Sequence, residues 1–234
     1  MKKQKKLVAI GDIHGRSIWK IIAGRHKTDR IVFLGDYFDP YGNIDAMDMI
    51  ENFNAIITLK KERPDDIILL LGNHDMHYID DRFPRSSRHD DMLAPVIREK
   101  FLKNRDLFQY AFQEGDVIFT HAGICDRWFN EEFKGSAIPK EGEKSIADQL
   151  NNPSAEQLMA MYHVGRVRGG SDQEGGIFWA DITETEGNPL KGYHQVVGHT
   201  QVPYLHEKVL SDDTSITYCD TLGFCHDYFQ MDQK

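Results

Sequence analysis

The chain has 234 residues, and its hydrophobic content of 40% and charged content of 28% are ordinary for a globular protein. The formal net charge of −9 argues against an extensive nucleic-acid surface, because binding to a phosphate backbone depends on clustered Lys and Arg. No stretch of the sequence approaches the roughly 20 apolar residues of a membrane-spanning helix, so we expect no membrane partner and a single domain over residues 1–234.

The cysteines and the first residues together predict a cytoplasmic location. Cys125, Cys219 and Cys225 are odd in number and lack CxxC spacing, which favours free thiols in a reducing compartment. Residues 1–6 are basic, like the start of a signal peptide. The apolar run that follows ends at Asp12, however, and is too short for the roughly 7–15 residues of a signal core.

The first half of the chain alternates aliphatic runs with helical patterns. The runs at residues 7–10, 31–34 and 67–71 predict strands that are buried on both faces. Helices are expected between them, over residues 17–24 and 45–61. This alternation implies right-handed crossovers and a parallel sheet.

The second half of the chain predicts shorter elements. Up to residue 143 they are an irregular charged segment over 77–89, a helix over 94–103, a hairpin of strands 107–112 and 117–120, a short helix over 128–133 and a loop over 134–143. A helix follows the capping box of Ser154 and Gln157, and a glycine-rich segment covers 165–176. The remaining elements are a strand that ends at Val197, an antiparallel pair over 204–210 and 215–220, and a last strand over 224–229. The glycine-rich segment lacks the pattern of a nucleotide P-loop.

Polar side chains follow five of the predicted strands at the point where each strand ends. They are Asp12 and His14, Asp36, Asn73, His121 and His199. Because ligands lie beyond the carboxyl ends of strands in α/β sheets, we expect these side chains to converge. Three imidazoles, two carboxylates and one amide oxygen suit Mn²⁺, Fe or Zn²⁺ better than Ca²⁺ or Cu⁺. Six ligands exceed what one catalytic zinc takes and fit two ions that share a carboxylate.

The same segments carry a family resemblance. They read GDIHG at 11–15, GDYFD at 35–39, GNHD at 72–75, HAG at 121–123 and GHT at 198–200. This ordered series resembles the calcineurin-like metallophosphoesterase superfamily. Residues 176–181 and 219–223 further resemble motifs of its phosphoprotein-phosphatase branch, which includes bacterial and phage serine/threonine phosphatases and diadenosine tetraphosphatases. The resemblance implies an α/β fold of two facing mixed β-sheets flanked by helices, with the active site at the strand C-terminal ends.

The resemblance also implies a role for each matched residue. Two divalent metal ions, Mn²⁺ first and Fe or Zn²⁺ as alternatives, would be held by Asp12 and His14, by Asp36 as the bridge, and by Asn73, His121 and His199. A hydroxide between the ions would attack phosphorus. His74 would protonate the leaving oxygen as the general acid, and Asp39 would orient His74.

One position departs from the family pattern. The branch usually has an arginine after Asp39 that clamps the substrate phosphate, whereas this chain has Pro40. Losing this planar donor weakens the expectation of a phosphomonoester substrate. Candidate replacements are Arg166 and Arg168 first, and then Arg82, Arg85 and Arg88.

Three functions therefore stay open at this point. We expect a phosphomonoesterase that acts on phosphoproteins or small phosphorylated molecules. A dinucleoside polyphosphate hydrolase or phosphodiesterase is the alternative that Pro40 favours. A non-catalytic scaffold is disfavoured by the complete ligand set. Outside the motifs, Cys125 is expected to be a buried inert thiol, Trp179 a core or wall residue, and His77 and His89 surface or packing residues.

Overall fold

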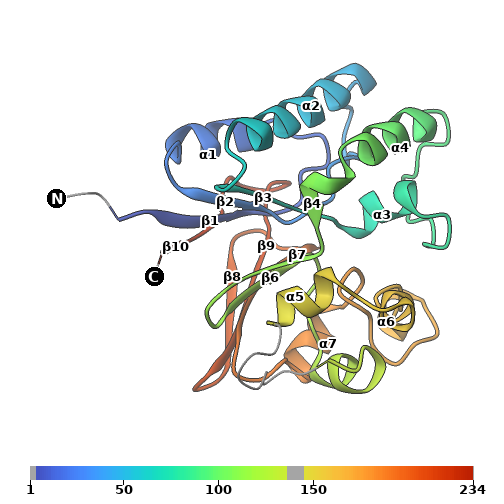
Figure 1. The fold of residues 1–234 in the computed structure, drawn as a ribbon, viewed down its shortest axis with the longest axis vertical. Helices are drawn as coiled ribbons and strands as arrows, with labels where there is room; N and C mark the ends of the chain where they lie inside the picture. Colours follow the sequence, from blue (N-terminus) through green and yellow to red (C-terminus); the bar gives the residue numbers. More distant parts are fainter. Residues whose placement is uncertain (1–3, 136–144, 234) are drawn as a thin grey trace.

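The computed structural model describes residues 4–135 and 145–233, and these residues contain two five-stranded sheets that pack against each other (Figure 1). The first sheet has the strand order β10-β1-β2-β3-β4. Its strands are β1 (Lys6–Ile10), β2 (Arg30–Phe33), β3 (Ile67–Leu70), β4 (Phe108–Gln109) and β10 (Phe229–Asp232). Strands β1 to β4 run parallel, as predicted, and β10 runs antiparallel to β1.

The second sheet has the strand order β5-β6-β7-β9-β8. Its strands are β5 (Ala111–Glu114), β6 (Val117–Thr120), β7 (His194–Gln201), β8 (His206–Ser211) and β9 (Thr214–Asp220). The central strands β6, β7 and β9 are parallel, whereas β5 and β8 pair antiparallel at the two edges. Both sheets are therefore mixed, which confirms the expected fold class.

Helices flank the two sheets (Figure 1). The first sheet is covered by α1 (Trp19–Arg25), α2 (Ala46–Glu62) and α4 (Ala94–Lys103), while α3 (Asn73–Ile79) begins shortly after β3. The second sheet is accompanied by α5 (Ile146–Asn151), α6 (Ala155–Ala160) and α7 (Ile182–Gly187). Three single turns complete the described elements: the 3₁₀ turns η1 (Arg105–Leu107) and η3 (Arg166–Arg168) and the π turn η2 (Trp128–Glu132).

Strand β1 shows why the aliphatic runs are continuous. Leu7 and Ala9 pack with Phe119 of the second sheet, whereas Val8 and Ile10 belong to the apolar cluster that includes the covering helices. Successive side chains of a strand point to opposite faces, so a strand that is covered on both faces needs an apolar residue at every position. Since the apolar cluster continues from one sheet to the other, we propose that residues 1–234 form one domain.

The prediction of one strand over 107–112 is wrong, because this segment contributes to both sheets. Strand β4 pairs with β3, and β5 pairs with β6. The change of sheet takes place at Tyr110. The side-chain oxygen of Asn151 accepts hydrogen bonds from the N–H of Tyr110 at 2.8 Å and from the N–H of Ala111 at 3.1 Å. Asn151 lies 41 positions beyond Tyr110, so no local pattern could reveal this bend.

The prediction of a last strand over 224–229 is also wrong. The N–H groups of Phe224 and Cys225 bond to the carbonyl of Thr221 and form a turn, and the strand β10 begins only at Phe229. The backbone donors of Phe224 and Cys225 are thus used locally and are not offered to a sheet.

Further differences concern short helices. Residues 77–79 belong to α3 and not to the irregular segment predicted over 77–89, and α5 and α7 were not predicted. Most of the loop predicted over 134–143 falls on residues 136–144, outside the described residues. Among the helices of the described ranges, none has the combined length and apolar character that crossing a membrane requires.

Candidate active site

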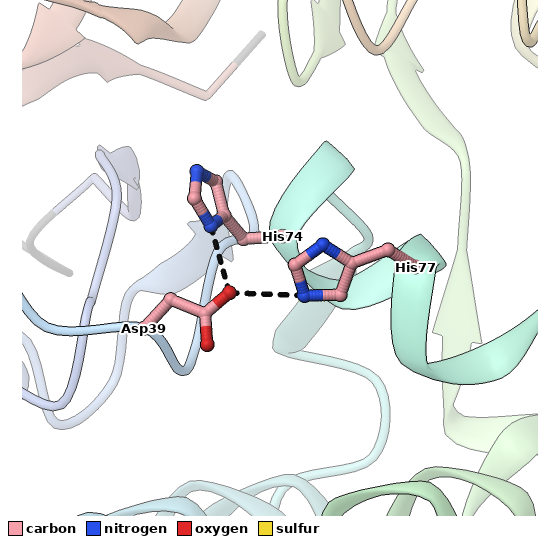
Figure 2. A group of neighbouring side chains, drawn as sticks. All are labelled: Asp39, His74 and His77. Atoms are coloured by element: carbon pink, nitrogen blue, oxygen red, sulfur yellow. Dashed lines mark hydrogen bonds and ion pairs between the residues drawn. The ribbon is translucent and has the colours of Figure 1, made fainter. Parts of the chain in front are cut away.

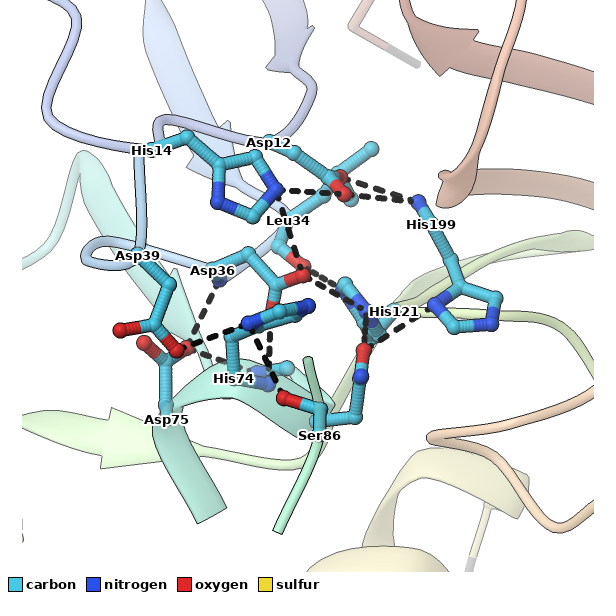
Figure 3. Close-up of polar contacts among 12 residues, drawn as sticks. Asp12, His14, Leu34, Asp36, Asp39, His74, Asp75, Ser86, His121 and His199 are labelled. Atoms are coloured by element: carbon cyan, nitrogen blue, oxygen red, sulfur yellow. Dashed lines mark hydrogen bonds and ion pairs between the residues drawn. The ribbon is translucent and has the colours of Figure 1, made fainter. Parts of the chain in front are cut away.

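The six predicted metal ligands follow four strands or lie on a fifth, and they come close together (Figure 3 labels all of them except Asn73). Asp12 and His14 follow β1, Asp36 follows β2, Asn73 begins α3 after β3, and His121 follows β6. The strand predicted to end at Val197 continues as β7 to Gln201, so His199 lies on this strand and not after it. All of them except the half-buried His199 are almost inaccessible to solvent. The structure thus brings all six predicted ligands together.

The first donor group consists of Asp12, His14 and Asp36, which are close enough to hold one metal ion. Nε2 of His14 lies 3.8 Å from Oδ2 of Asp12 and 3.7 Å from Oδ2 of Asp36. The other ring nitrogen, Nδ1, lies 2.8 Å from the carbonyl oxygen of Phe38 and therefore carries the ring hydrogen. Nε2 of His14 consequently directs a lone pair at two carboxylates.

The second donor group consists of Asn73, His121 and His199. Oδ1 of Asn73 lies 2.9 Å from Nε2 of His121 and 3.0 Å from Nδ1 of His199. Nδ1 of His121 lies 2.8 Å from the carbonyl oxygen of Leu34, so it carries the hydrogen and leaves Nε2 bare. Nε2 of His121 also lies 3.5 Å from Oδ2 of Asp36, which thereby reaches both groups. Nε2 of His121 and Oδ1 of Asn73 are both acceptors at 2.9 Å, and such a pair repels unless one cation binds both.

Burial sets the protonation states of the site. It lowers the pKa of His121 and of His199, and it lowers the pKa of His14 to about 4, so all three rings are neutral at pH 7. Burial and the neighbouring carboxylates raise the pKa of Asp12. Burial also opposes ionisation of Asp36, but the surrounding histidines outweigh it and lower the pKa of that carboxyl. Neutral imidazoles beside buried carboxyl groups are donors of the kind that metal ions require.

Asp75 holds the loops that carry the predicted ligands. Its Oδ2 accepts hydrogen bonds from the N–H groups of Asp36 and Gly72, both at 2.8 Å, and its Oδ1 accepts one from the N–H of Tyr37 at 2.9 Å. A single buried carboxylate therefore joins the loop after β2 to the start of α3 (Figure 3).

The backbone of the site is strained. Four of its residues have a positive φ: His14 at 43°, Asp36 at 53°, Asp39 at 59° and His199 at 63°. Non-glycine residues adopt this conformation at a cost, and such residues cluster at functional sites. Hydrogen bonds between distant segments hold them in place; for example, the N–H of His199 donates to Oδ1 of Asp12 at 2.9 Å.

His74 and Asp39, the predicted acid and its partner, form a buried pair. Nδ1 of His74 donates to Oδ2 of Asp39 at 2.8 Å, and the N–H of His74 donates to Oδ1 of Asp36 at 2.9 Å. Burial lowers the pKa of His74, but Asp36 and Asp39 outweigh this effect and raise it above its ordinary value. The imidazole of His74 lies edge-on to that of His14, with ring centres 5.1 Å apart.

A cavity of about 340 Å³ lies over the two donor groups and His74. Tyr41, Arg85, Arg168 and Trp179 form much of its wall. Trp179, expected in the core or in a wall, lies edge-on to His199 at 5.8 Å between ring centres. Cys125 is fully buried, and burial raises the pKa of its thiol, which agrees with an inert thiol.

The candidate arginines differ in position. Arg168 lines the cavity, where its Nε lies 2.8 Å from Oδ2 of Asp181 and its Nη2 donates to Oγ1 of Thr200 at 2.8 Å. Arg166 is exposed and does not line this cavity. The other three have partners nearby: Arg82 pairs with Asp80, Arg85 pairs with Asp91 at the cavity wall, and Arg88 donates to the carbonyl of Pro40.

Three residues of the site received no role from the sequence. Asp75 belongs to a quoted motif, Asp220 lines the cavity beside Asp12, and His77 lies against Asp39 although it was expected at the surface or in packing. The available signal for His77 was its spacing of three residues from His74. That spacing has meaning only if a helix begins at Asn73, which we did not predict.

Comparison with known proteins identifies the class. A family model described as calcineurin-like phosphoesterase matches residues 5–203. The chain therefore belongs to the calcineurin-like phosphoesterase family and is a metallophosphoesterase, an enzyme that hydrolyses phosphoric esters.

Solved structures show the same fold. Two crystal structures of a cold-active protein tyrosine phosphatase have TM-scores of 0.61 and 0.62 and 19% identity, and they match 98% of this chain and 76% and 74% of their own chains. A protein serine/threonine phosphatase from Saccharomyces cerevisiae, with similarity to human phosphatase PP5, has a TM-score of 0.50 and 15% identity over 93% of this chain and 68% of its own. At these identities the likeness concerns the fold alone.

Proposed function

We propose that this metallophosphoesterase hydrolyses phosphomonoesters, such as phosphoproteins or small phosphorylated molecules, at a dinuclear metal centre. The position of Asp36 carries the proposal. Its Oδ2 lies 3.7 Å from Nε2 of His14 and 3.5 Å from Nε2 of His121, and both nitrogens are bare. One carboxylate oxygen between two donor groups suits a pair of ions a few ångströms apart.

The six ligands would divide between the two ions. Asp12 and His14 would hold one ion, Asn73, His121 and His199 would hold the other, and Asp36 would contact both. Mn²⁺ is our first choice because the donors mix oxygen and nitrogen, and Fe or Zn²⁺ are the alternatives. When bound, the ions would neutralise phosphate oxygens and lower the pKa of water from about 15.7 toward neutrality.

His74 would donate a proton to the leaving oxygen. Because its Nδ1 is occupied by Asp39, Nε2 is the nitrogen that remains for the substrate. The raised pKa of His74 favours the protonated ring, since Asp36 and Asp39 outweigh the effect of burial. An alkoxide is a poor leaving group, and a positioned acid accelerates its departure on the order of 10²–10⁴-fold.

Arg168 would bind the substrate phosphate in place of the arginine that Pro40 replaces. Asp181 and Thr200 hold its guanidinium at the cavity wall, which reduces the freedom lost on binding. Arg166 remains a weaker candidate because its side chain is exposed.

A second candidate, hydrolysis of a phosphodiester or a dinucleoside polyphosphate, is favoured by Arg88. Its guanidinium lies 4.2 Å from the ring centre of Tyr41 and donates to the carbonyl of Pro40 at 3.1 Å. The arginine nearest Pro40 is thus already bound to the carbonyl of Pro40 and to the ring of Tyr41, and it is not free to clamp a phosphate as the usual arginine does. A phosphodiester carries one negative charge fewer than a monoester and needs fewer cationic contacts. This argument applies to the phosphodiester alone, because a dinucleoside polyphosphate carries more negative charge than a monoester.

We also propose a cytoplasmic location. Cys125, Cys219 and Cys225 are free thiols, as a reducing compartment favours.

A substrate panel tests the function. With Mn²⁺ added, we expect the protein to hydrolyse p-nitrophenyl phosphate faster than bis-p-nitrophenyl phosphate. Asp36→Asn should abolish both activities, and Asp65→Asn, at an exposed aspartate between α2 and β3, should leave them unchanged. Preference for the diester would replace our first choice by the second candidate. Full activity of Asp36→Asn would contradict the dinuclear centre.

A further inference from the structure

Asp39 contacts a second imidazole that no motif marks (Figure 2). Nε2 of His77 lies 2.9 Å from Oδ2 of Asp39, the same oxygen that accepts from Nδ1 of His74 at 2.8 Å. The hydroxyl of Tyr78 donates to the other carboxylate oxygen at 2.5 Å. His74 and His77 are three residues apart on α3, so both rings project from one side of the helix toward the loop that carries Asp39.

Ser86 joins the two histidines from the other side. Its N–H donates to Nδ1 of His77 at 3.2 Å, and its Oγ lies 2.9 Å from that nitrogen and 3.1 Å from Nδ1 of His74. A ring nitrogen that accepts from a backbone N–H carries no hydrogen. The hydrogen of a neutral His77 is therefore on Nε2, the nitrogen beside Asp39, so the neighbours of His77 assign its tautomer.

The Asp39 carboxyl is ionised at neutral pH whether or not His77 contacts it. Burial raises the pKa of Asp39, but the hydrogen bonds from His74, His77 and Tyr78 outweigh it and hold that pKa at about 2. The carboxylate is thus ionised far below neutral pH even if one contact is lost. What His77 can control is the direction of the carboxylate, because its own side chain is 0% exposed and its Nδ1 is held by Ser86.

We propose that His77 is a positioning residue for proton transfer, holding the Asp39 carboxylate so that His74 directs Nε2 at the leaving oxygen. The inference rests on the proposed function, in which His74 is the acid. Without His77, Oδ2 of Asp39 keeps the hydrogen bond from His74 and Oδ1 keeps the one from Tyr78, but the imidazole that contacts Oδ2 at 2.9 Å is gone and the carboxylate can tilt toward the space it leaves. Proton delivery then loses its direction, while the metal ligands keep their places.

The same three side chains could also hold a cation, since Asp39, His74 and His77 have ligand atoms within 4.8 Å of one another. An ion at this place would take the Nδ1 lone pair of His74 and so remove the hydrogen that Nδ1 donates to Asp39. Such a third ion and the positioning role therefore exclude each other, and the metal content of the protein distinguishes them.

The test uses two substitutions at one position. His77→Leu removes the ring nitrogen that contacts Asp39 at 2.9 Å, whereas His77→Gln retains an amide N–H in the place of Nε2. His89→Leu is the packing control: the ring of His89 lies 4.8 Å from that of His77 and stacks on that of Tyr78 at 4.7 Å, and no hydrogen bond or ion pair between His89 and Asp39 is seen in the described part of the chain. Each variant is assayed with Mn²⁺ on phosphoserine, a poor leaving group, and on p-nitrophenyl phosphate, a good one. Melting temperature and bound metal are measured in parallel.

We expect His77→Leu to lower kcat on phosphoserine on the order of tenfold and kcat on p-nitrophenyl phosphate by no more than about twofold, with KM unchanged. His77→Gln should recover most of the loss, and His89→Leu should match the wild type. In a His74→Asn background, His77→Leu should cause no further loss. Should His77→Leu fail to fold, His77→Asn provides the same comparison, because its shorter amide takes the place of Nδ1 and leaves no donor in the place of Nε2, and we expect a loss with the same dependence on the leaving group.

Equal losses on the two esters, a His77→Gln variant as slow as His77→Leu, or a third bound ion that His77→Leu lacks would overturn the inference. If the His77→Asn comparison is the one used, equal losses on both esters would overturn it too. Failure of the proposed function gives a different result. The wild type would then hydrolyse neither ester with Mn²⁺, or His74→Asn would keep full activity on phosphoserine.

Discussion

Gly72 provides the sharpest test of how closely the site is built. A Cβ at this position would lie 2.1 Å from Oδ1 of Asp36 and 2.6 Å from Cε1 of His121. The φ of Gly72 is −109°, a value that alanine adopts without strain. Gly72→Ala therefore probes the space around the proposed bridging carboxylate and leaves the backbone preference unchanged.

The size of the effect follows from these distances. A Cβ essentially never approaches another heavy atom closer than 3.0 Å, so the carboxylate of Asp36 must withdraw by about 1 Å. A displacement of this size at a reacting centre costs on the order of 10²-fold in rate. Overpacking costs about 1–3 kcal/mol, which for a chain of this length lowers Tm by between about 2 and 12 °C. We expect kcat/KM to fall roughly a hundredfold in a protein that still folds.

The assay is kcat/KM on p-nitrophenyl phosphate with Mn²⁺, together with Tm and bound metal per chain. Gly24→Ala is the control, because Gly24 lies in α1 and a Cβ there meets nothing within 4 Å. This control should raise Tm slightly, since alanine is favoured over glycine in a helix by roughly 0.5–1 kcal/mol, and should leave kcat/KM unchanged. A Gly72→Ala variant with wild-type kcat/KM and two bound ions would refute the close packing on which the role of Asp36 depends.

Three further predictions concern the acid, the substrate phosphate and acid stability. His74→Asn should lower kcat on phosphoserine on the order of 10²–10⁴-fold and affect p-nitrophenyl phosphate less; equal losses would argue against an acid. Arg168→Ala should weaken competitive inhibition by inorganic phosphate on the order of tenfold, whereas Arg166→Ala should not; similar effects of both would contradict the choice of Arg168. The pKa of Asp39 falls from 3.8 to about 2, because its hydrogen bonds outweigh burial, so its contribution of about 2 kcal/mol is present above pH 4 and is lost as pH falls through 2. Urea unfolding of the metal-free protein from pH 5 to pH 2 should show this additional loss of unfolding free energy in the wild type relative to Asp39→Asn. If the unfolding free energies of the two proteins fall in parallel with pH, the prediction is disproved.

The positions of the predicted ligands could be located because each lies close to the end of a strand that its own sequence identifies. Asp36 follows β2 by three residues and His14 follows β1 by four, so the strand position nearly fixes the position of the side chain. The strands were recognisable because both faces of the first sheet are covered and positions 7–10 of β1 are all apolar. Local sequence and global fold agree here.

Contacts between distant segments were not predictable. The bend at Tyr110 depends on Asn151, and the difference between Arg166 and Arg168 depends on the turn η3 and on Asp181. Two arginines separated by one residue look alike in a sequence. Only the fold places one of them at the cavity wall and leaves the other in solvent.

Helix α3 combines a start that the strand before it locates with contacts to distant segments that the sequence does not reveal. It has 7 residues, too few to be stable by its own hydrogen bonds, and its first turns are held by the contacts of the site. Asn73 faces His121 and His199, His74 faces Asp39, Asp75 accepts from three backbone N–H groups, and His77 lies against Asp39. Because side chains with so many separate partners show no apolar periodicity, the segment after His74 resembles a loop in the sequence. The residues that conceal this helix from a sequence pattern are the same residues that position the site.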